Sequence, residues 1–323
     1  MYVLVFIFSI FLSLLVLMLE RAVGIPWDFH PDSATYITSS TDISEALLNS
    51  GNFTDLLNNG FYLIIHLLNS DVIIVTIYNM ALFALTNVMI FNILNKKSGA
   101  KYFYWGILFI LLNPYRIHLA TTVLKDTTII FLIVLSIYKK KSLIFTIPGL
   151  LIMRMASIIY VLSILLNGKF RIKNLYYPTI TILLIIFFIN IYSPERIINW
   201  IELTNNTDMV FREFDSVPTF REYGNYGILM RAIFWPLLFQ TGLFFLLSPS
   251  IAYFPIFLGS IFNLFYCKIY QKTYGILLAP YLGLAIISLF ASGFTTYLRY
   301  GMPIFTIIPL LIATRLTPST VKR

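Results

Sequence analysis

The sequence is poor in charged residues and in cysteine. Only 11% of its 323 residues are charged and 59% are hydrophobic, whereas an ordinary soluble domain has about 25% charged residues. One soluble core could not bury this much apolar surface, so part of the surface is expected to face lipid. The lone cysteine, Cys267, excludes an intramolecular disulfide and a metal site built from several cysteines.

Several nucleotide and hydrolase motifs are also missing. The sequence has no Walker loop, no G-x-G-x-x-G fingerprint, no H-E-x-x-H and no G-x-S-x-G. These absences count against ATP-driven transport, dinucleotide chemistry and the common hydrolase mechanisms. No cofactor is required by the sequence, although a divalent metal stays open.

Apolar runs that could cross a bilayer recur along the chain. A hydrocarbon core of about 30 Å needs about 20 apolar residues in a helix. Residues 142–166, with lysines at both ends, are predicted to form a hairpin of two short helices, and 228–247 a re-entrant or interfacial helix. The fold class is therefore all-α, a polytopic bundle of about ten membrane helices that forms a single integral domain over residues 1–323. The other predicted spans are 1–19, 72–94, 102–118, 123–138, 175–192, 251–267, 274–292 and 300–314.

The charges are unevenly divided between the two sides of this bundle. The side that holds both termini carries 14 basic residues and no acidic ones, whereas the other side carries nine basic residues and all 14 acidic ones. By the positive-inside rule, both termini are expected to be cytoplasmic. If 142–166 crossed only once, the basic cluster at 169–173 would instead lie outside. The net charge of +9 is thus interpreted as a topology signal, and no nucleic-acid partner is expected.

Two outer loops, 20–71 and 193–227, hold most of the polar residues. The first begins with Asp28, His30 and Asp32, held by Pro31 between aromatic residues. Two carboxylates and an imidazole at this spacing could form a general base or a divalent-metal site. The alternative is a solvated loop in which an aspartate caps a helix over 43–57.

A second polar concentration follows the turn Asn113–Pro114. Arg116, His118 and Lys125 could neutralise a lipid-linked phosphate, and Asp126 could orient Lys125 or bind a metal. The alternative is a structural set whose long side chains reach toward the headgroups. Residues 61–68 are too short to span and are predicted to form an interfacial helix, in which His66 is interpreted as a packed histidine.

Isolated cationic and aromatic residues complete the candidates. Arg154, Arg231 and Arg299 each lie among apolar or aromatic residues, where a guanidinium can bind phosphate or anchor the helix at the interface. Arg212, Arg221 and Tyr223 lie in the second outer loop. Their mixture of rings and charges suits sugar binding, and it suits an exposed surface helix equally.

The order of these features resembles the GT-C superfamily of polytopic glycosyltransferases. The matching features are the aspartate-bearing first loop, Leu124–Lys125–Asp126 at the head of an apolar helix, Arg154 in the short hairpin, and Arg299–Tyr300 before Pro303. The resemblance implies that the first-loop aspartate, Asp28 or Asp32, is the catalytic base. The small size and the composition rich in Ile, Asn and Lys are similar to O-antigen and capsule repeat-unit polymerases, although 193–227 lacks the arginine, glycine and histidine pattern of the better-known ones.

The resemblance implies an enzyme of the bacterial inner membrane with several spans. It would join undecaprenyl-diphosphate-linked repeat units on the periplasmic face, with the bilayer and a chain-length regulator as further partners. One alternative is a GT-C enzyme that adds a single sugar from a polyprenyl-phosphate donor. Another is a flippase or transporter of lipid-linked oligosaccharides, which is expected to show inverted repeats.

Overall fold

The computed structural model describes residues 1–97, 110–161, 220, 224–247, 254–269, 283–288 and 294–315. Every regular element within these ranges is a helix, which confirms the all-α class. The chain divides into two compact units, Met1–Val161 with Pro309–Arg323, and Leu162–Ile308. Each unit is described by itself below, and the single integral domain stays a prediction.

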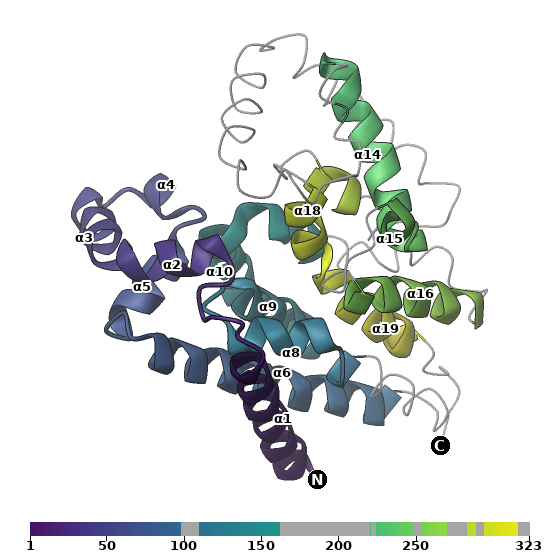
Figure 1. The fold of residues 1–323 in the computed structure, drawn as a ribbon, viewed down its shortest axis with the longest axis horizontal. Helices are drawn as coiled ribbons and strands as arrows, with labels where there is room; N and C mark the ends of the chain where they lie inside the picture. Colours follow the sequence, from purple (N-terminus) through teal and green to yellow (C-terminus); the bar gives the residue numbers. More distant parts are fainter. Residues whose placement is uncertain are drawn as a thin grey trace. The chain divides into compact units, whose positions relative to one another are not determined.

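Four helices form the centre of the first unit: α1 (Tyr2–Ala22), α6 (Val72–Lys97), α8 (Pro114–Thr121) and α9 (Asp126–Tyr138). Helix α1 packs against α6 and α8, and α6 also packs against α9 (Figure 1). Leu12 and Val16 of α1 meet Phe83 of α6 and Ile117 and Ala120 of α8 in an apolar cluster. The end of α1 is thereby fixed beside α8.

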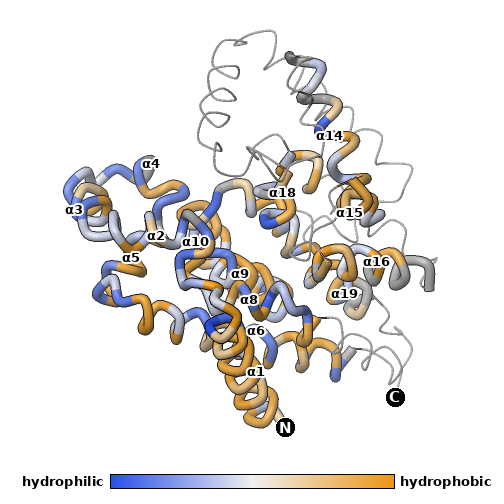
Figure 2. Tube along the Cα trace, in the orientation of Figure 1, coloured by the Kyte–Doolittle hydropathy of each residue, from blue (hydrophilic) through white to orange (hydrophobic). Residues whose placement is uncertain are grey.

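Helix α1 is polar where it is buried and apolar where it is exposed. Its only buried residues are Ser9, Ser13 and Glu20, whose spacings of four and seven residues place them on one helical face. Large apolar side chains such as Val3 and Phe11 are more than half exposed, and α1 is almost wholly hydrophobic in Figure 2. This arrangement is the reverse of a helix on the surface of a soluble protein.

Two helices of the described residues, α1 and α6, are long and apolar enough to cross a membrane. The helices predicted at 1–19 and 72–94 are therefore confirmed, but the expected number of about ten spans is not supported. Helix α9 has only 13 residues, and the run 175–192 lies outside the described ranges. Signal sequences and buried core helices can also be this long and apolar, so two such helices indicate membrane association only weakly.

The polar segment between α1 and α6 folds into four short helices: α2 (Pro31–Thr38), α3 (Ser40–Ser50), α4 (Phe53–Leu56) and α5 (Gly60–Leu67). Helix α5 confirms the short helix predicted at 61–68. The single helix predicted over 43–57 is wrong, because α3 ends at Gly51 in the left-handed region at φ 62°. Helix α5 packs against both α2 and α3.

The predicted span 102–118 is interrupted. Helix α8 begins only at Pro114, and the side chain of Asn113 accepts hydrogen bonds from the backbone N–H groups of Tyr115 and Arg116. An asparagine cap followed by proline at the first helical position is a strong helix start. The polar groups after it therefore belong to a separate short helix.

The predicted hairpin at 142–166 is described as far as Val161. A short 3₁₀ helix, η2 (Lys140–Ser142), leads into α10 (Leu143–Arg154), and another, η3 (Met155–Ser157), follows. Pro148 lies inside α10, which continues past it to Arg154. Residues 162–166, which would complete the hairpin, lie outside the described ranges.

The second unit contains α14 (Gly224–Thr241), α15 (Phe244–Leu247), α16 (Phe254–Ile269), α18 (Phe294–Gly301) and the start of α19 (Pro303–Arg315). Helices α14 and α15 together cover the predicted stretch 228–247. They are separated at Gly242, whose φ of 74° favours glycine. Helix α16 confirms a helix at 251–267, and the last run begins at Pro303 and not at 300.

Candidate functional site

Three ionisable side chains from distant parts of the first unit form one hydrogen-bonded chain. The Nδ1 atom of His118 lies 2.7 Å from Oε1 of Glu20. The Nε2 atom of His118 lies 2.9 Å from Nε2 of His30. The chain Glu20–His118–His30 thus joins the end of α1, the last turn of α8 and the residue before α2.

Glu20 occupies an unfavourable position that its partners compensate. It is only 9% exposed and lies in the last turn of α1, where the helix dipole disfavours a negative charge. The Thr121 hydroxyl lies 2.6 Å from its second oxygen, Oε2. Both carboxylate oxygens therefore have a partner, as a buried carboxylate requires.

The proton arrangement of His118 follows from its neighbours. An ionised carboxylate can only accept, so Nδ1 of His118 must carry the proton that it donates to Glu20. His118 also lies in the last turn of α8, where a positive charge is favoured. The rings of Phe29 and Tyr115 lie 6.0 and 5.9 Å from the His118 ring, between centroids. Glu20, Phe29 and Tyr115 thus surround the His118 ring.

His30 is held at the start of α2. It is the N-cap residue with an extended backbone, and Pro31 follows at the first helical position. Its side chain makes no capping bond to the helix and instead reaches His118. The ring of Phe29 packs edge-on against it, with 5.2 Å between centroids.

The two aspartates predicted as bases flank His30 differently. Asp28 is exposed, whereas Asp32 is half-buried in the first turn of α2, where the dipole favours a carboxylate. Burial raises the pKa of Tyr62 on α5, and the charge of Asp32 adds to this rise. Asp32 therefore faces the α2–α5 packing, and the role of either aspartate as base stays a prediction.

Lys125 connects the second polar concentration to the first. Its Nζ donates to the backbone oxygen of Asn58 at 3.0 Å and lies 5.8 Å from the centre of the Tyr36 ring. Lys125 is 9% exposed. The first loop and the segment 113–126 thus meet in the first unit, while phosphate binding by Lys125 stays a prediction.

Asp126 forms a buried ion pair with Arg154, 28 residues further along the chain. Oδ1 of Asp126, at the start of α9, accepts from Nη1 of Arg154, at the end of α10, at 2.7 Å. The two side chains are 4% and 6% exposed. This buried ion pair fixes α10 to α9, and phosphate binding by Arg154 stays a prediction.

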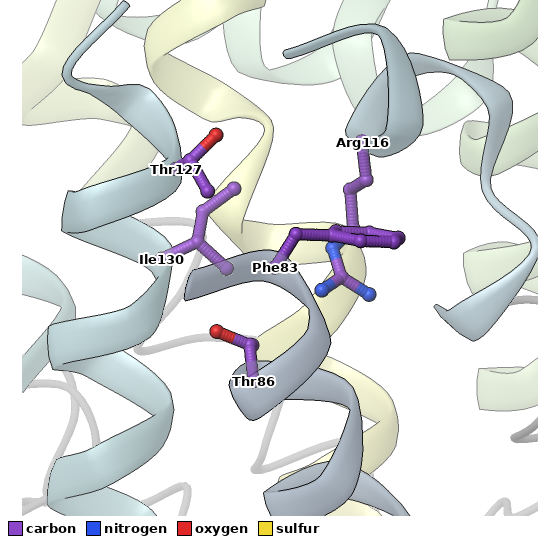
Figure 3. Close-up of a pocket in the computed structure, with 5 residues that line it drawn as sticks. All are labelled: Phe83, Thr86, Arg116, Thr127 and Ile130. Atoms are coloured by element: carbon purple, nitrogen blue, oxygen red, sulfur yellow. The ribbon is translucent and has the colours of Figure 1, made fainter. Parts of the chain in front are cut away.

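Arg116 is committed to internal partners. Its Nη1 donates to the backbone oxygen of Ile110 at 2.6 Å, and its Nη2 donates to Asn87 Oδ1 at 3.1 Å. The guanidinium also lies over the Phe83 ring, 5.2 Å from its centre. Thr86, Thr127 and Ile130 complete a small cavity beside it, shown in Figure 3. The cavity has room for about one water molecule, so it is too small for a sugar.

Two predicted arginines lie in the second unit. Arg231 on α14 is 3% exposed and lies 5.5 Å from the centre of the Trp235 ring. Arg299 on α18 is half-buried and lies 5.5 Å from the centre of the Tyr300 ring. The predicted sugar-binding residues Arg212, Arg221 and Tyr223 lie outside the described ranges. Phosphate or sugar binding by these five stays a prediction.

Among the described residues, no group of three or more His, Cys, Asp or Glu side chains is arranged to hold a metal ion. The 2.9 Å between the two Nε2 atoms agrees with this, because zinc between them would need about 2 Å to each nitrogen. As it stands, the chain of three is suited to sharing protons.

Sequence reasoning missed Glu20 and Thr121. Glu20 was assigned to the outer loop, but the spacing of buried positions on α1 continues past Leu19 to include it. Extending the helical period by one turn would have placed this carboxylate on the face of Ser9 and Ser13.

Comparison of the chain with protein-family models, with curated proteins and with solved structures found no match.

Proposed function

We propose that the protein is a membrane-embedded glycosyltransferase that polymerises lipid-linked sugar repeat units. The observation that carries the proposal is the meeting of two polar segments, 20–71 and 113–126, at one end of the apolar helix α1. Hydrogen bonds between these segments join Glu20 and His30 to His118, and Asn58 to Lys125. Acid–base groups and a cation are thus placed where a lipid-linked substrate would present its sugar and phosphate.

Membrane embedding is supported by the inverted character of α1. A bilayer favours apolar side chains on the outer surface of a helix and polar ones toward neighbouring helices. Ser9 of α1 accepts from Nδ2 of Asn87 on α6 at 3.1 Å, and the Tyr2 hydroxyl donates to Asn92 of α6 at 2.9 Å. These polar contacts suit helices that associate in lipid. We extend the proposal to about ten spans with both termini in the cytoplasm.

The proposed reaction is glycosyl transfer with an undecaprenyl-diphosphate leaving group on the periplasmic face of a bacterial inner membrane. An acceptor hydroxyl would give up its proton to the segment 28–32, which contains Asp28 and Asp32, and attack the anomeric carbon of the donor. Lys125 lies over the Tyr36 ring of α2, the helix that follows this segment. It would stabilise the negative charge on the departing diphosphate.

The polymerase proposal is tested in cells that make surface polysaccharide with this gene deleted. We expect deletion to leave lipopolysaccharide with a single repeat unit, and the wild-type gene to restore the ladder on a gel. A ladder that persists with every rung shifted would support the addition of a single sugar. Loss of every repeat unit, including the first, would support a flippase. Either of these results would contradict the polymerase.

A further inference from the structure

An exposed aromatic ring lies in the segment between α1 and α2. Phe29 is 50% exposed, although two imidazole rings pack against it. The centroids of the His30 and His118 rings lie 5.2 and 6.0 Å from its own, and both contacts are edge-on, with an interplanar angle of 80°. The Phe29 ring is therefore fixed against its neighbours while half of its surface stays open to a partner.

The backbone that carries Phe29 is fixed by the end of α1. Gly24 lies in the left-handed region at φ 82°, and the N–H of Ile25 donates to the backbone oxygen of Glu20 at 2.8 Å. These are the marks of a Schellman motif. The N–H of Phe29 then donates to the backbone oxygen of Pro26 at 3.3 Å, which closes a turn. A ligand that binds the ring therefore does not have to order this segment first.

The groups around the open ring are polar. Asp28 directly precedes Phe29 and is exposed, and the imidazoles of His30 and His118 lie at the other side of the ring. An acyl chain over Phe29 would bring the neighbouring carboxylate into an apolar environment, which is costly for a charged group. The partner that fits this surface is apolar over the ring and polar at its rim.

A pyranose has both of these surfaces. Its ring faces present C–H groups whose hydrogens carry a partial positive charge, and the face of a phenylalanine ring carries a partial negative charge. The hydroxyl groups at the rim of the sugar can donate to a carboxylate such as that of Asp28. A sugar stacked on Phe29 would thus present its hydroxyls to the segment 28–32.

We propose that Phe29 is the stacking residue for the acceptor sugar, and that one pyranose of the acceptor repeat unit packs its C–H face on the open side of this ring. The assignment rests on the proposed glycosyltransferase function, in which the acceptor hydroxyl gives up its proton to the segment 28–32. Phe29 binds and orients the sugar and takes no part in the proton transfer.

Binding is tested with the oligosaccharide that mild acid releases from the lipid-linked repeat unit, on the purified full chain in lipid nanodiscs. This probe lacks both the diphosphate and the lipid, so it reports on contacts to sugar alone. Phe29→Ala should raise its Kd, measured by saturation-transfer NMR, by about tenfold, the scale of one stacked ring contact. Phe29→Tyr keeps the ring and should keep the Kd within about threefold. Phe29→Leu is apolar but has no ring face, so it should resemble Phe29→Ala.

The matched control is Phe8→Ala. Phe8 lies on α1 and is 51% exposed, beside the exposed apolar residues Ile7 and Phe11, so it should keep the wild-type Kd. Elongation of undecaprenyl-diphosphate-linked repeat unit gives a second readout. Phe29→Ala should raise KM by about tenfold and change kcat by less than about threefold, as expected for lost substrate binding, whereas Phe8→Ala should match the wild type.

Three results would overturn the assignment. The first is a Phe29→Ala variant with the Kd and KM of Phe8→Ala. The second is wild-type affinity in Phe29→Leu together with a loss in Phe29→Ala, which indicates an apolar contact with lipid. The third is an equal loss in Phe29→Ala and Phe29→Tyr, which indicates a structural role. Each of these leaves the proposed function standing if the wild-type protein elongates the substrate. A wild-type protein that does not elongate it would overturn the proposed function, and the assignment with it.

Discussion

The buried ion pair between Asp126 and Arg154 allows a quantitative prediction about the stability of the first unit. The pair joins α9 to α10 at 2.7 Å, and its side chains are 4% and 6% exposed. Removing one member of such a pair leaves a buried charge without its counter-ion and costs about 3–5 kcal/mol, whereas replacing both members is close to neutral. Asp126→Asn is therefore expected to lower the free energy of unfolding by about 4 kcal/mol.

The two single variants are not expected to be equal. Arg154→Met leaves Asp126 buried at the first residue of α9, where the helix dipole stabilises the remaining carboxylate by up to about 1 kcal/mol. Arg154→Met should thus be the milder variant by about that amount. In the double variant no charge is left, so most of the stability should return and its cost should fall well below that of either single variant.

Pulse proteolysis across a denaturant series, on protein in detergent micelles, measures these differences as shifts in the fraction cleaved. Asp42→Asn is a matched control because Asp42 also lies in a first turn, that of α3, but is exposed; it should cost less than about 1 kcal/mol. Single variants that each cost less than about 1 kcal/mol, or a double variant whose cost is the sum of the two, would refute the reasoning. A stable double variant with a strongly raised KM would instead favour the phosphate-binding role predicted for Arg154.

Three further predictions concern backbone groups, measured by the same proteolysis. Asp71→Ala should lower the free energy of unfolding by about 1 kcal/mol, because Oδ1 of Asp71 accepts from backbone N–H groups in the first turn of α6 at 2.7 and 3.1 Å. Asp71→Asn should keep most of this stabilisation, and equal losses in the two variants would contradict a capping role. Asn79→Ala should cost about 1–3 kcal/mol, because its buried amide donates to two carbonyl oxygens between α8 and α9 at 2.7 and 3.2 Å; an unchanged midpoint would exclude these bonds. Gly51→Ala should lower the free energy of unfolding by about 1 kcal/mol because of the backbone φ of 62° alone, since nothing lies within 4 Å of the added methyl group. Gly51→Asn should lower it less, and a larger loss in Gly51→Asn than in Gly51→Ala would contradict a left-handed cap.

Sequence periodicity was sufficient for the apolar helices α1, α6 and α9, because long runs of apolar residues have few other stable arrangements. It could not pair individual side chains, since the hydrogen bond between His30 and His118 joins positions 88 residues apart. Such a contact depends on how α1, α6 and α8 pack, and a single sequence does not encode that packing in a readable pattern.

The errors in the fold come from local chemistry that overrode hydrophobicity. The run 102–118 was read as one span because its composition is apolar, but the asparagine cap and Pro114 begin a new helix. Arg116 was predicted to bind phosphate because an arginine near a span is costly without a partner. Its partners turned out to include an internal carbonyl and Asn87, which satisfy the same physical demand.

The central claim is that the protein itself joins lipid-linked repeat units. The most direct measurement is product length after purified protein in lipid vesicles is incubated with undecaprenyl-diphosphate-linked repeat unit, without ATP or nucleotide sugar. The account predicts a ladder of products that differ by one repeat unit and lengthen with time. Substrate that gains only one sugar, or that crosses the bilayer without any covalent change, would contradict it.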